Sequence, residues 1–345
     1  MSKTHTSMQT QGPTTISILG KGAVGTALAT QCRAMNLDVS VVRMQGTPIT
    51  SDSDLFKEYT FDTWLKGVSE KKPSSHWVFC TVPDDSIPDT VNKITGIWNH
   101  VSKDPLSEGL QAIIHTSGVR TSRDFERVKQ QGVAAASMHP IQTFHKPSVG
   151  SVGSASIQST TIQSTASHPK SSTKNSQSLS NPFSSIQITL EGDESLLPSL
   201  VLFCEQTLQA KPIRVTQAQK QQIHAAAVLS SNFLFPNLSL ASALLRDVSL
   251  SPDILDPLVQ SAAQKALHEG LTAISGPVAR LDTQTVQRNM DALHSHPTAL
   301  KRYISESEFL IHQLTELGHF EGKSEDLQDL RAVLTKESER LSDEC

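Results

Sequence analysis

Up to about residue 215, short apolar runs alternate with longer segments of helical periodicity. The runs predict strands at residues 16–19, 39–42, 76–82, 112–115, 133–138 and 186–190, with helices between them such as 23–35 and 87–98. Strands that are apolar throughout are typical of a parallel sheet covered on both faces by helices. The pattern predicts an α/β domain with a doubly wound, mostly parallel sheet, completed by a helix at 195–208 and an edge strand at 213–215.

From Thr216 onward the pattern is helical only. Helices are predicted to begin at Ala218, after Ser251, near Asp282, at Thr298 and at Ser324. Pro236 is expected to kink or interrupt the first of them, because proline removes a backbone donor and clashes with the preceding turn. We therefore expect an α/β domain over residues 14–215, an all-α domain over 216–317, and a C-terminal helix or tail over 318–345.

Two segments lack the large apolar residues that would offset the entropy of ordering. Residues 1–13 are predicted to be a disordered N-terminus, and the Ser-rich residues 146–182 a disordered insertion within the first domain. The insertion is expected to be a solvated surface loop, and a regulatory role is the alternative.

Charge and composition narrow the function classes. The net charge is −4, so no basic surface field favours a nucleic-acid partner. The four cysteines are scattered without CxxC spacing, which argues against disulfides and bound metal and fits a reducing compartment. The polar residues 1–13 show no apolar core of a leader, so we expect neither a secretory leader nor a membrane-spanning run and predict a cytoplasmic protein.

A glycine motif stands where the first strand meets the first helix. The spacing Gly20-x-Gly22-x-x-Gly25 is that of the Rossmann dinucleotide-binding fingerprint. Gly20 allows the turn, Gly22 lets a pyrophosphate approach, and Gly25 lets the helix pack closely on the strand. The helix N-terminus, with Ala23 and Val24, offers N–H groups to the phosphates. A glycine-rich turn that binds nothing is the alternative.

Arg43 ends the second predicted strand, where enzymes that use NAD usually carry an acidic residue for the ribose 2′-hydroxyl. An arginine cannot accept that hydrogen bond but can pair with a 2′-phosphate. The residue favours NADP as cofactor, with NAD second, unless Arg43 is an ordinary surface arginine.

Polar residues follow the later strands. Ligands of open α/β sheets bind beyond the carboxyl ends of the strands, so further cofactor contacts are expected there, from Val82, Pro83, His115, Ser117 and Gly118. His139 follows the next strand. A histidine can donate a proton near neutral pH, although His115 and His139 could instead be hydrogen-bonded core residues.

The first helix of the second part places Lys220, His224 and Ser231 on one face, with Asn232 beside Ser231. These residues are candidates for a catalytic role. The alternative is an alanine-rich packing helix whose polar residues satisfy neighbouring backbone groups.

Taken together, these motifs resemble a known family. It is the group of Rossmann-like NADP oxidoreductases whose C-terminal half is a helical domain of unknown function (DUF2520-type), distantly similar to pyrroline-5-carboxylate reductase and ketopantoate reductase. The resemblance covers about residues 15–315 and rests on the glycine fingerprint and on segments 82–85, 115–118, 139–144, 191–193, 224–227, 231–232 and 276–280. The family usually has glycine after the last segment, where this chain has Leu281.

The resemblance implies a nucleotide domain, a helical domain that often dimerises, and a hydride-transfer site in the cleft between them. The resemblance does not supply a substrate. We predict an NADP-dependent oxidoreductase that passes hydride to a C=O or C=N carbon of a small-molecule substrate. Better-known relatives use a Lys-x-x-x-Asn pair, which here reads Lys220 and His224, so His224 and Asn232 are the expected replacements. Arg280 is expected to hold a substrate carboxylate. The alternative function is a dinucleotide-binding sensor or interaction module without turnover.

Overall fold

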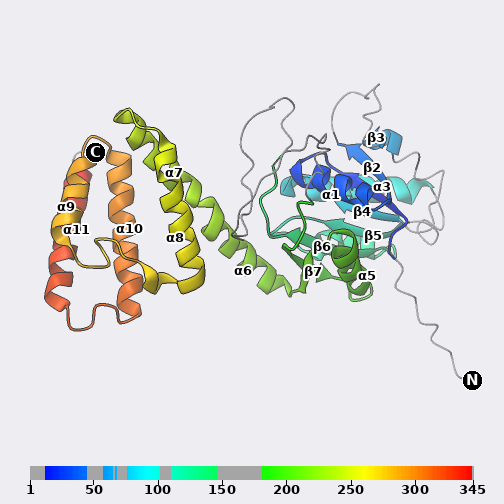
Figure 1. The fold of residues 1–345 in the computed structure, drawn as a ribbon. Coiled ribbons are helices and arrows are strands. Elements are labelled where there is room, and N and C mark those ends of the chain that lie inside the picture. The colour runs from blue at the N-terminus through cyan, green and yellow to red at the C-terminus, as the bar shows by residue number, and fades with distance from the viewer. Residues whose placement is uncertain are drawn as a thin grey trace, which may run out of the picture. The chain divides into compact units, whose positions relative to one another are not determined.

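The computed structural model describes residues 12–44, 57–64, 67, 76–101, 110–145 and 181–343. The predicted disordered segments at the N-terminus and at 146–182 lie almost entirely outside the described residues; only residues 12–13 and 181–182 of them are described. The chain divides into two compact units, Met1–Leu229 and Ser230–Cys345 (Figure 1).

The first unit is built on a sheet in the order β3-β2-β1-β4-β5-β6-β7-β8. Neighbouring strands are parallel except β6 and β7. The prediction of a doubly wound, mostly parallel sheet is therefore confirmed. The strands are β1 (Thr15–Leu19), β2 (Asp38–Arg43), β3 (Lys57–Thr60), β4 (His76–Cys80), β5 (Leu110–His115), β6 (Ala134–Pro140), β7 (Gln187–Gly192) and β8 (Lys211–Arg214).

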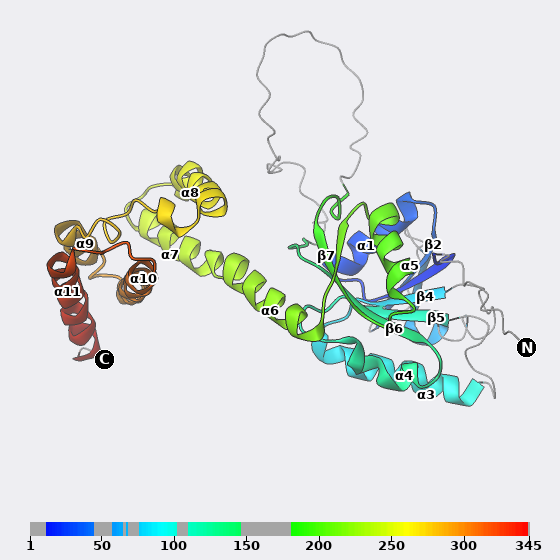
Figure 2. The same ribbon diagram turned by 90° about the horizontal axis from the view of Figure 1, so that it is seen from below.

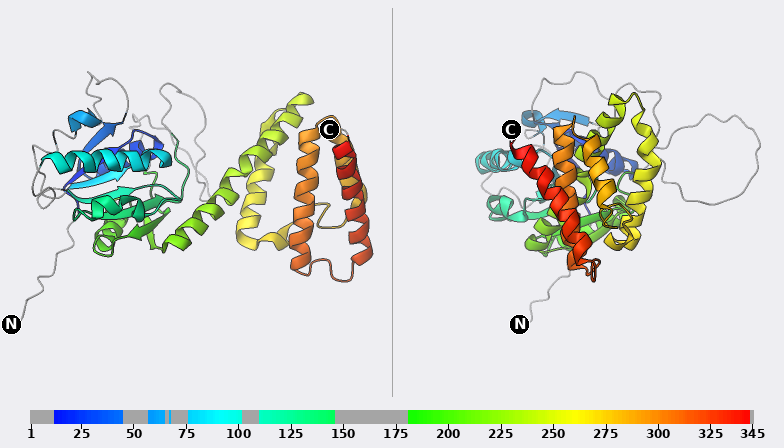
Figure 3. Two further views of the ribbon diagram at one scale, coloured as in Figure 1. Left: turned by 180° about the vertical axis from the view of Figure 1, so that it is seen from behind. Right: turned by 90° about the vertical axis from the view of Figure 1, so that its left-hand side faces the viewer.

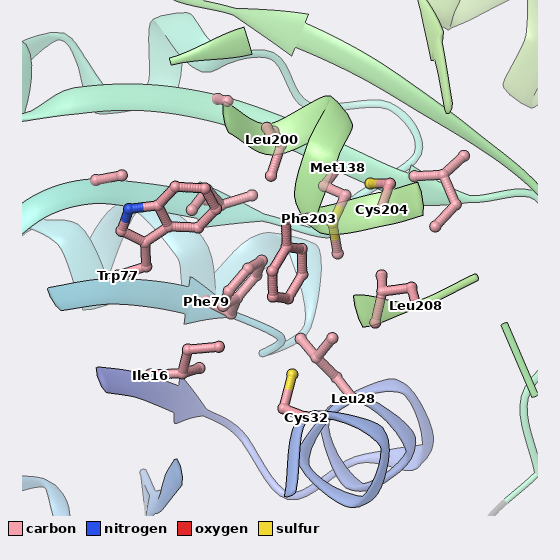
Figure 4. Packing of buried hydrophobic residues seen from close by; sticks show 14 of the residues in the cluster. Ile16, Leu28, Cys32, Trp77, Phe79, Met138, Leu200, Phe203, Cys204 and Leu208 are labelled. Atoms are coloured by element: carbon pink, nitrogen blue, oxygen red, sulfur yellow. The ribbon is translucent and has the colours of Figure 1, made fainter. Parts of the chain in front are cut away.

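Helices cover both faces of this sheet. Figure 2 shows α1 (Ala23–Ala34) and α5 (Leu197–Leu202) on one face, and α3 (Ile87–Val101) and α4 (Glu126–Lys129) on the other. Successive residues of a strand point to opposite faces, so Phe79 of β4 packs beneath α1 while Val78 faces α3. In Figure 4, Phe79 stacks on Phe203 of the π-helical turn η3 (Phe203–Thr207), with a ring-centroid distance of 5.4 Å.

The parallel strands bring their carboxyl ends to one edge of the sheet. The register pairs Leu19 of β1 with both Val42 of β2 and Cys80 of β4, and pairs Cys80 with His115 of β5. The loops that follow these four strands are therefore neighbours. They are the loops to which the sequence assigned the nucleotide.

The first helix of the helical part is counted with the first unit. α6 (Gln217–Ala227) begins in a capping box, in which Thr216 Oγ1 accepts from Gln219 N–H at 3.2 Å. A π-helical turn, η4 (Val228–Asn232), then leads into α7 (Leu234–Asp247). Pro236 lies in the first turn of α7, where its missing N–H has no intrahelical partner to lose. The predicted interruption takes the form of this π-helical turn, which ends at Asn232, four residues before Pro236.

The second unit matches the predicted helices closely. It contains α8 (Asp256–Glu269), preceded by the 3₁₀ turn η5 (Pro252–Leu255), and then α9 (Thr283–Ala292), α10 (Pro297–Glu316) and α11 (Ser324–Asp343). Figure 3 shows α9, α10 and α11 side by side. Their apolar faces form a core that includes Met290, Leu300, Ile311 and Leu330. α7 and α8 contribute no buried residue.

One expectation about apolar runs needs correction. Within the described residues, the helical stretch Gln217–Asp247 is long and apolar enough, by length and composition alone, to cross a membrane, and none of its apolar window is buried. A single stretch of this kind, judged by length and composition, is weak evidence for a membrane span.

Candidate cofactor and active site

The loop between β1 and α1 is packed so tightly that two of its glycines admit no side chain. A Cβ on Gly25 would lie 2.1 Å from the Gly20 carbonyl oxygen and 2.5 Å from Thr81 Oγ1. Gly20 has a φ of +112°, and its Cβ would lie 2.9 Å from the Thr81 backbone. Thr81 Oγ1 also donates to the Gly20 carbonyl at 2.9 Å. Internal packing therefore accounts for Gly20 and Gly25.

Gly22 differs from both. A Cβ there would find one neighbour within 4 Å, the Thr81 carbonyl oxygen at 3.9 Å. Nothing described in the protein requires a glycine at this position, and the space beside its backbone is open. Gly22 is also the N-cap of α1, with no side-chain cap and no acidic residue in the first turn. The N–H groups at this helix end are thus suited to an anion such as a pyrophosphate.

The open space belongs to a pocket of about 830 Å³ at the carboxyl edge of the sheet. Most of the cofactor contacts predicted from the sequence line it: Gly20, Gly22, Ala23, Val24, Arg43, Val82, Pro83, Ser117 and Gly118. Gly25 and His115 do not. Gly25 lies beneath the loop, and His115 is fully buried beside Phe125, with a ring-centroid distance of 5.3 Å. The pocket also includes Lys21, Thr81, Asp84 and Phe144. Sequence analysis did not assign these four to the cofactor, although Lys21, Asp84 and Phe144 lie within its motif segments.

At one end of the pocket, Arg43 and Lys21 share an acidic partner. Arg43 Nε donates to Glu58 Oε2 at 3.0 Å, and Lys21 Nζ donates to the other carboxylate oxygen of Glu58. Burial alone would raise the pKa of Glu58, but Lys21 and Arg43 together lower it below its ordinary value. Glu58 comes from β3, a strand of four residues with the sequence Lys-Glu-Tyr-Thr that has no apolar run to predict it.

Lys220 is a buried cation next to the pocket. Only 1% of the residue is exposed, and its Nζ donates to the Ser117 carbonyl oxygen at 2.5 Å. Burial lowers the pKa of Lys220 to about 8, although Glu191 and Asp84 act in the opposite direction. Glu191 is itself buried and accepts from Ser122 Oγ at 2.7 Å and from Gln217 Nε2 at 3.2 Å. The lysine thus supports the backbone of a pocket residue.

His139 and His224 lie beside each other, with ring centroids 5.6 Å apart. His139 Nδ1 lies 3.1 Å from the Thr116 carbonyl oxygen. A carbonyl can only accept, so Nδ1 carries the proton and Nε2 of the neutral ring is an acceptor. Burial lowers the pKa of His139, which favours this neutral form. His224 packs against Gly118, where a Cβ would lie 2.1 Å from its Nδ1.

Burial lowers the pKa of His115 to about 3, with Lys220 adding to the effect. A fully buried histidine that stays neutral is placed to pack and not to exchange protons with a ligand. His115 therefore lies in the core and outside the pocket, but among the described residues neither of its ring nitrogens has a hydrogen-bond partner, so it is not the hydrogen-bonded core residue offered as the alternative.

The remaining predicted site residues belong to the second unit. Ser231 Oγ donates to Asn232 Oδ1 at 3.0 Å. Arg280 is exposed and its Nη1 donates to the Ser275 carbonyl oxygen. Leu281, where the family usually has glycine, adopts a φ of +58°. The left-handed conformation is therefore kept without the residue that favours it.

Comparison with solved structures finds chains that share this fold. The chain is similar to a Bacteroides fragilis protein described as "putative NADP oxidoreductase BF3122", with 19% identity, a TM-score of 0.60, and coverage of 86% of this chain and 98% of that one. It is similar to a reductive aminase of Aspergillus terreus in complex with NADPH and ethyl-5-oxohexanoate, with 12% identity, a TM-score of 0.53, and coverage of 89% and 95%.

A third similar structure is the protein TM1727 of Thermotoga maritima, with 19% identity, a TM-score of 0.52, and coverage of 88% of this chain and 99% of that one. At these identities the likeness shows a shared fold. No protein with a curated description matches the sequence significantly.

A family model decides the C-terminal assignment. The model of the domain of unknown function DUF2520 matches residues 186–308. These residues are a DUF2520 domain. The resemblance on which the sequence analysis relied, a Rossmann-like domain followed by DUF2520, is thereby confirmed. The domain match begins at β7, so the DUF2520 segment includes the last strands of the sheet as well as the helices that follow.

Proposed function

We propose that this protein is an NADP-dependent oxidoreductase that transfers hydride between NADPH and a carbonyl or imine carbon of a small metabolite. The observation that carries the proposal is the open backbone at Gly22. A glycine that the protein's own packing does not require lies at an uncapped helix N-terminus, in a pocket that Lys21 and Arg43 also line. NADP oxidoreductase and NADPH-bound aminase structures of the same fold support it.

The pocket residues fit a dinucleotide at each of its parts. The N-terminus of α1 would bind the pyrophosphate, Lys21 and Arg43 would bind the 2′-phosphate, and Val82, Pro83, Ser117 and Gly118 would lie toward the reacting end. Bound NADPH would supply the hydride. The protein's task is then to orient cofactor and substrate and to supply a proton.

Among the candidates for proton donation, the geometry favours His224 over His139. Neutral His139 presents an acceptor at Nε2, because its Nδ1 proton is committed to Thr116. His224 lies behind Gly118, a residue of the pocket wall. Lys220 would act through the Ser117 carbonyl as a positioning group. Asn232 and Arg280 are proposed to bind the substrate, Arg280 through a carboxylate.

Cofactor binding tests this function before any substrate is known. Calorimetry with NADPH and NADH should show tighter binding of NADPH. Arg43→Ala should weaken NADPH binding by roughly 1.5–3 kcal/mol, the worth of a charge-assisted hydrogen bond, and leave NADH binding nearly unchanged. If neither NADPH nor NADH binds, the proposal is refuted. Tight binding without steady NADPH consumption across carbonyl and imine substrates would instead favour a sensor.

We further propose that the helical domain forms a homodimer in the cytoplasm. Several large apolar side chains of α7 and α8 are exposed, including Phe235, Leu258 and Leu267, while neither helix contributes a buried residue. An apolar surface of this kind usually marks an interface. Helix-on-helix pairing of two chains would also account for the apolar stretch Gln217–Asp247 without a membrane.

Light scattering at micromolar concentration should report a dimer. Leu258→Glu combined with Leu267→Glu should dissociate it, while Leu317→Glu, an exposed apolar position outside α7 and α8, should not. A monomeric wild type would exclude the homodimer. Partition of the wild type into vesicles would favour a membrane instead.

A further inference from the structure

We propose that Glu58 sets how strongly this pocket discriminates between NADP and NAD, by serving as a built-in counter-charge to the two cations that face the 2′ position. The inference rests on the proposed function and assigns a role to a residue that no motif marks. It follows from three facts: where Glu58 lies, which donors the two cations keep for a ligand, and what net charge results.

The first fact concerns the position of Glu58 behind the pocket wall. Lys21 and Arg43 line the pocket, whereas Glu58 is not among the lining residues. The Glu58 side chain is 5% exposed, against 34% for Lys21 and 38% for Arg43. The two cations are therefore held between the carboxylate on one side and the open pocket on the other.

The second fact is that both cations keep donors for a ligand. Arg43 uses its Nε on Glu58, and among the described residues no hydrogen bond occupies its two terminal nitrogens. An ammonium group has three donors, and one Lys21 donor meets Glu58. A phosphate in the pocket can thus be bound by Lys21 and Arg43 while both remain paired with Glu58.

The third fact is the charge balance. The trio of Lys21, Arg43 and Glu58 carries a net charge of +1, because the carboxylate cancels one of two cations. A 2′-phosphate at neutral pH carries about −1.5 to −2 charges. It therefore meets half the positive charge that the two cations alone would offer, and it also meets a carboxylate a few ångströms behind them. NAD has no 2′-phosphate and does not experience this balance.

The consequence is that the site prefers NADP over NAD less strongly than the two cations alone would. With the carboxylate in place, the site attracts NADP without binding it so tightly that exchange of spent cofactor becomes slow. Removing only the charge of Glu58, with its shape and one acceptor retained, should raise the affinity for NADP and leave that for NAD nearly unchanged.

The decisive experiment measures the dissociation constants of NADPH and NADH for the full-length chain by calorimetry. Glu58→Gln should tighten NADPH binding about tenfold while NADH changes less than about twofold. Asp38→Asn is the matched control. Asp38 is also an acid on the β2–β3 strand pair and also pairs with a lysine, Lys57 at 3.5 Å, but it lies at the opposite end of β2 from Arg43. Asp38→Asn removes the same charge as Glu58→Gln and should leave the dissociation constants of NADPH and NADH unchanged.

A second variant pair keeps the test decisive if Glu58→Gln folds poorly. In Arg43→Ala the remaining pair has no net charge, and in Arg43→Ala with Glu58→Gln the net charge returns to +1. The double variant should therefore bind NADPH more tightly than Arg43→Ala. An unchanged NADPH-to-NADH ratio in Glu58→Gln, or weaker NADPH binding than in wild type, would overturn the role of Glu58. If the wild type binds neither nucleotide, the proposed function itself fails.

Discussion

Gly118 and His224 are in such close contact that the glycine has no room for a methyl group. A Cβ on Gly118 would lie 2.1 Å from His224 Nδ1 and 2.7 Å from its Cε1. Gly118 follows β5 and lines the pocket, whereas His224 comes from α6, more than a hundred residues later. This contact joins the carboxyl edge of the sheet to α6, the first helix of the segment that matches DUF2520.

Gly118→Ala should therefore displace the His224 ring. We expect a loss of stability of about 1–3 kcal/mol, the usual cost of overpacking, and a loss of turnover larger than the loss of NADPH affinity. Thermal unfolding and binding titrations measure the two effects. Gly12→Ala is the control, because a Cβ at Gly12 has no neighbour within 4 Å. Unchanged stability in Gly118→Ala would show that His224 moves aside freely.

Gly22 and Gly25 should fail in opposite ways when substituted. Gly22→Val places a side chain in the open space of the pocket, so it should abolish NADPH binding while the melting temperature stays within a few degrees of wild type. Gly25→Val places one against the Gly20 carbonyl oxygen, so it should destabilise the fold itself. Differential scanning fluorimetry with and without NADPH separates the outcomes. Normal NADPH binding by Gly22→Val would show that the loop holds no phosphate.

Lys220 should make the protein gain stability as the pH rises above 8. Burial lowers the pKa of Lys220 from its ordinary 10.5 to about 8 in the folded chain, so between these values the unfolded chain binds the extra proton. Between pH 8 and 10.5, the free energy of unfolding of the wild type should rise by at most about 3 kcal/mol more than that of Lys220→Met. Urea unfolding from pH 7 to 10.5 tests this. Parallel curves for the two proteins would mean that Lys220 keeps its ordinary pKa.

His115 should contribute to acid unfolding. Burial lowers the pKa of His115 to about 3. Between pH 6.5 and 3, the imidazole is therefore protonated in the unfolded chain and neutral in the folded chain. Stability contributed by the neutral ring is then lost as the pH falls, by about 1.4 kcal/mol per pH unit per group at the steepest. His115→Phe should flatten the dependence between pH 5 and 6.5. An equally steep curve would show that other groups cause it, such as His76, whose pKa burial lowers to about 4.

The sequence predicts the strands and helices of this molecule better than the side-chain contacts at its candidate site. Apolar runs such as 76–82 identify a strand wherever the sheet is buried on both faces, and caps such as Asp282 locate helix starts. β3 escapes prediction because it is a polar edge strand of four residues. Glu58 and its contacts with Lys21 and Arg43 escape with it, since only the pairing of β2 with β3 brings them together. The burial of Lys220 likewise depends on where α6 docks, which helical spacing does not encode.

The roles of His224 and His139 can be separated by substituting each of them in turn. Each is within reach of the other, with ring centroids 5.6 Å apart, so proximity alone does not choose the proton donor. His139 has its Nδ1 proton held by Thr116 and is kept neutral by burial, which makes His224 the expected general acid. Removing a general acid typically costs about a hundredfold to ten-thousandfold in rate.

His224→Gln should consequently keep NADPH affinity and lose turnover with any substrate found, whereas His139→Gln should lose far less. Both are measured as single-turnover NADPH oxidation at saturating cofactor, which removes binding differences from the comparison. If His139→Gln alone loses turnover, the roles are reversed. If neither substitution slows the reaction, the proton comes from water or from Lys220. Lys220→Arg then distinguishes the two, because arginine keeps the positive charge but does not release a proton near neutral pH. A loss of turnover in Lys220→Arg would show that the lysine donates the proton.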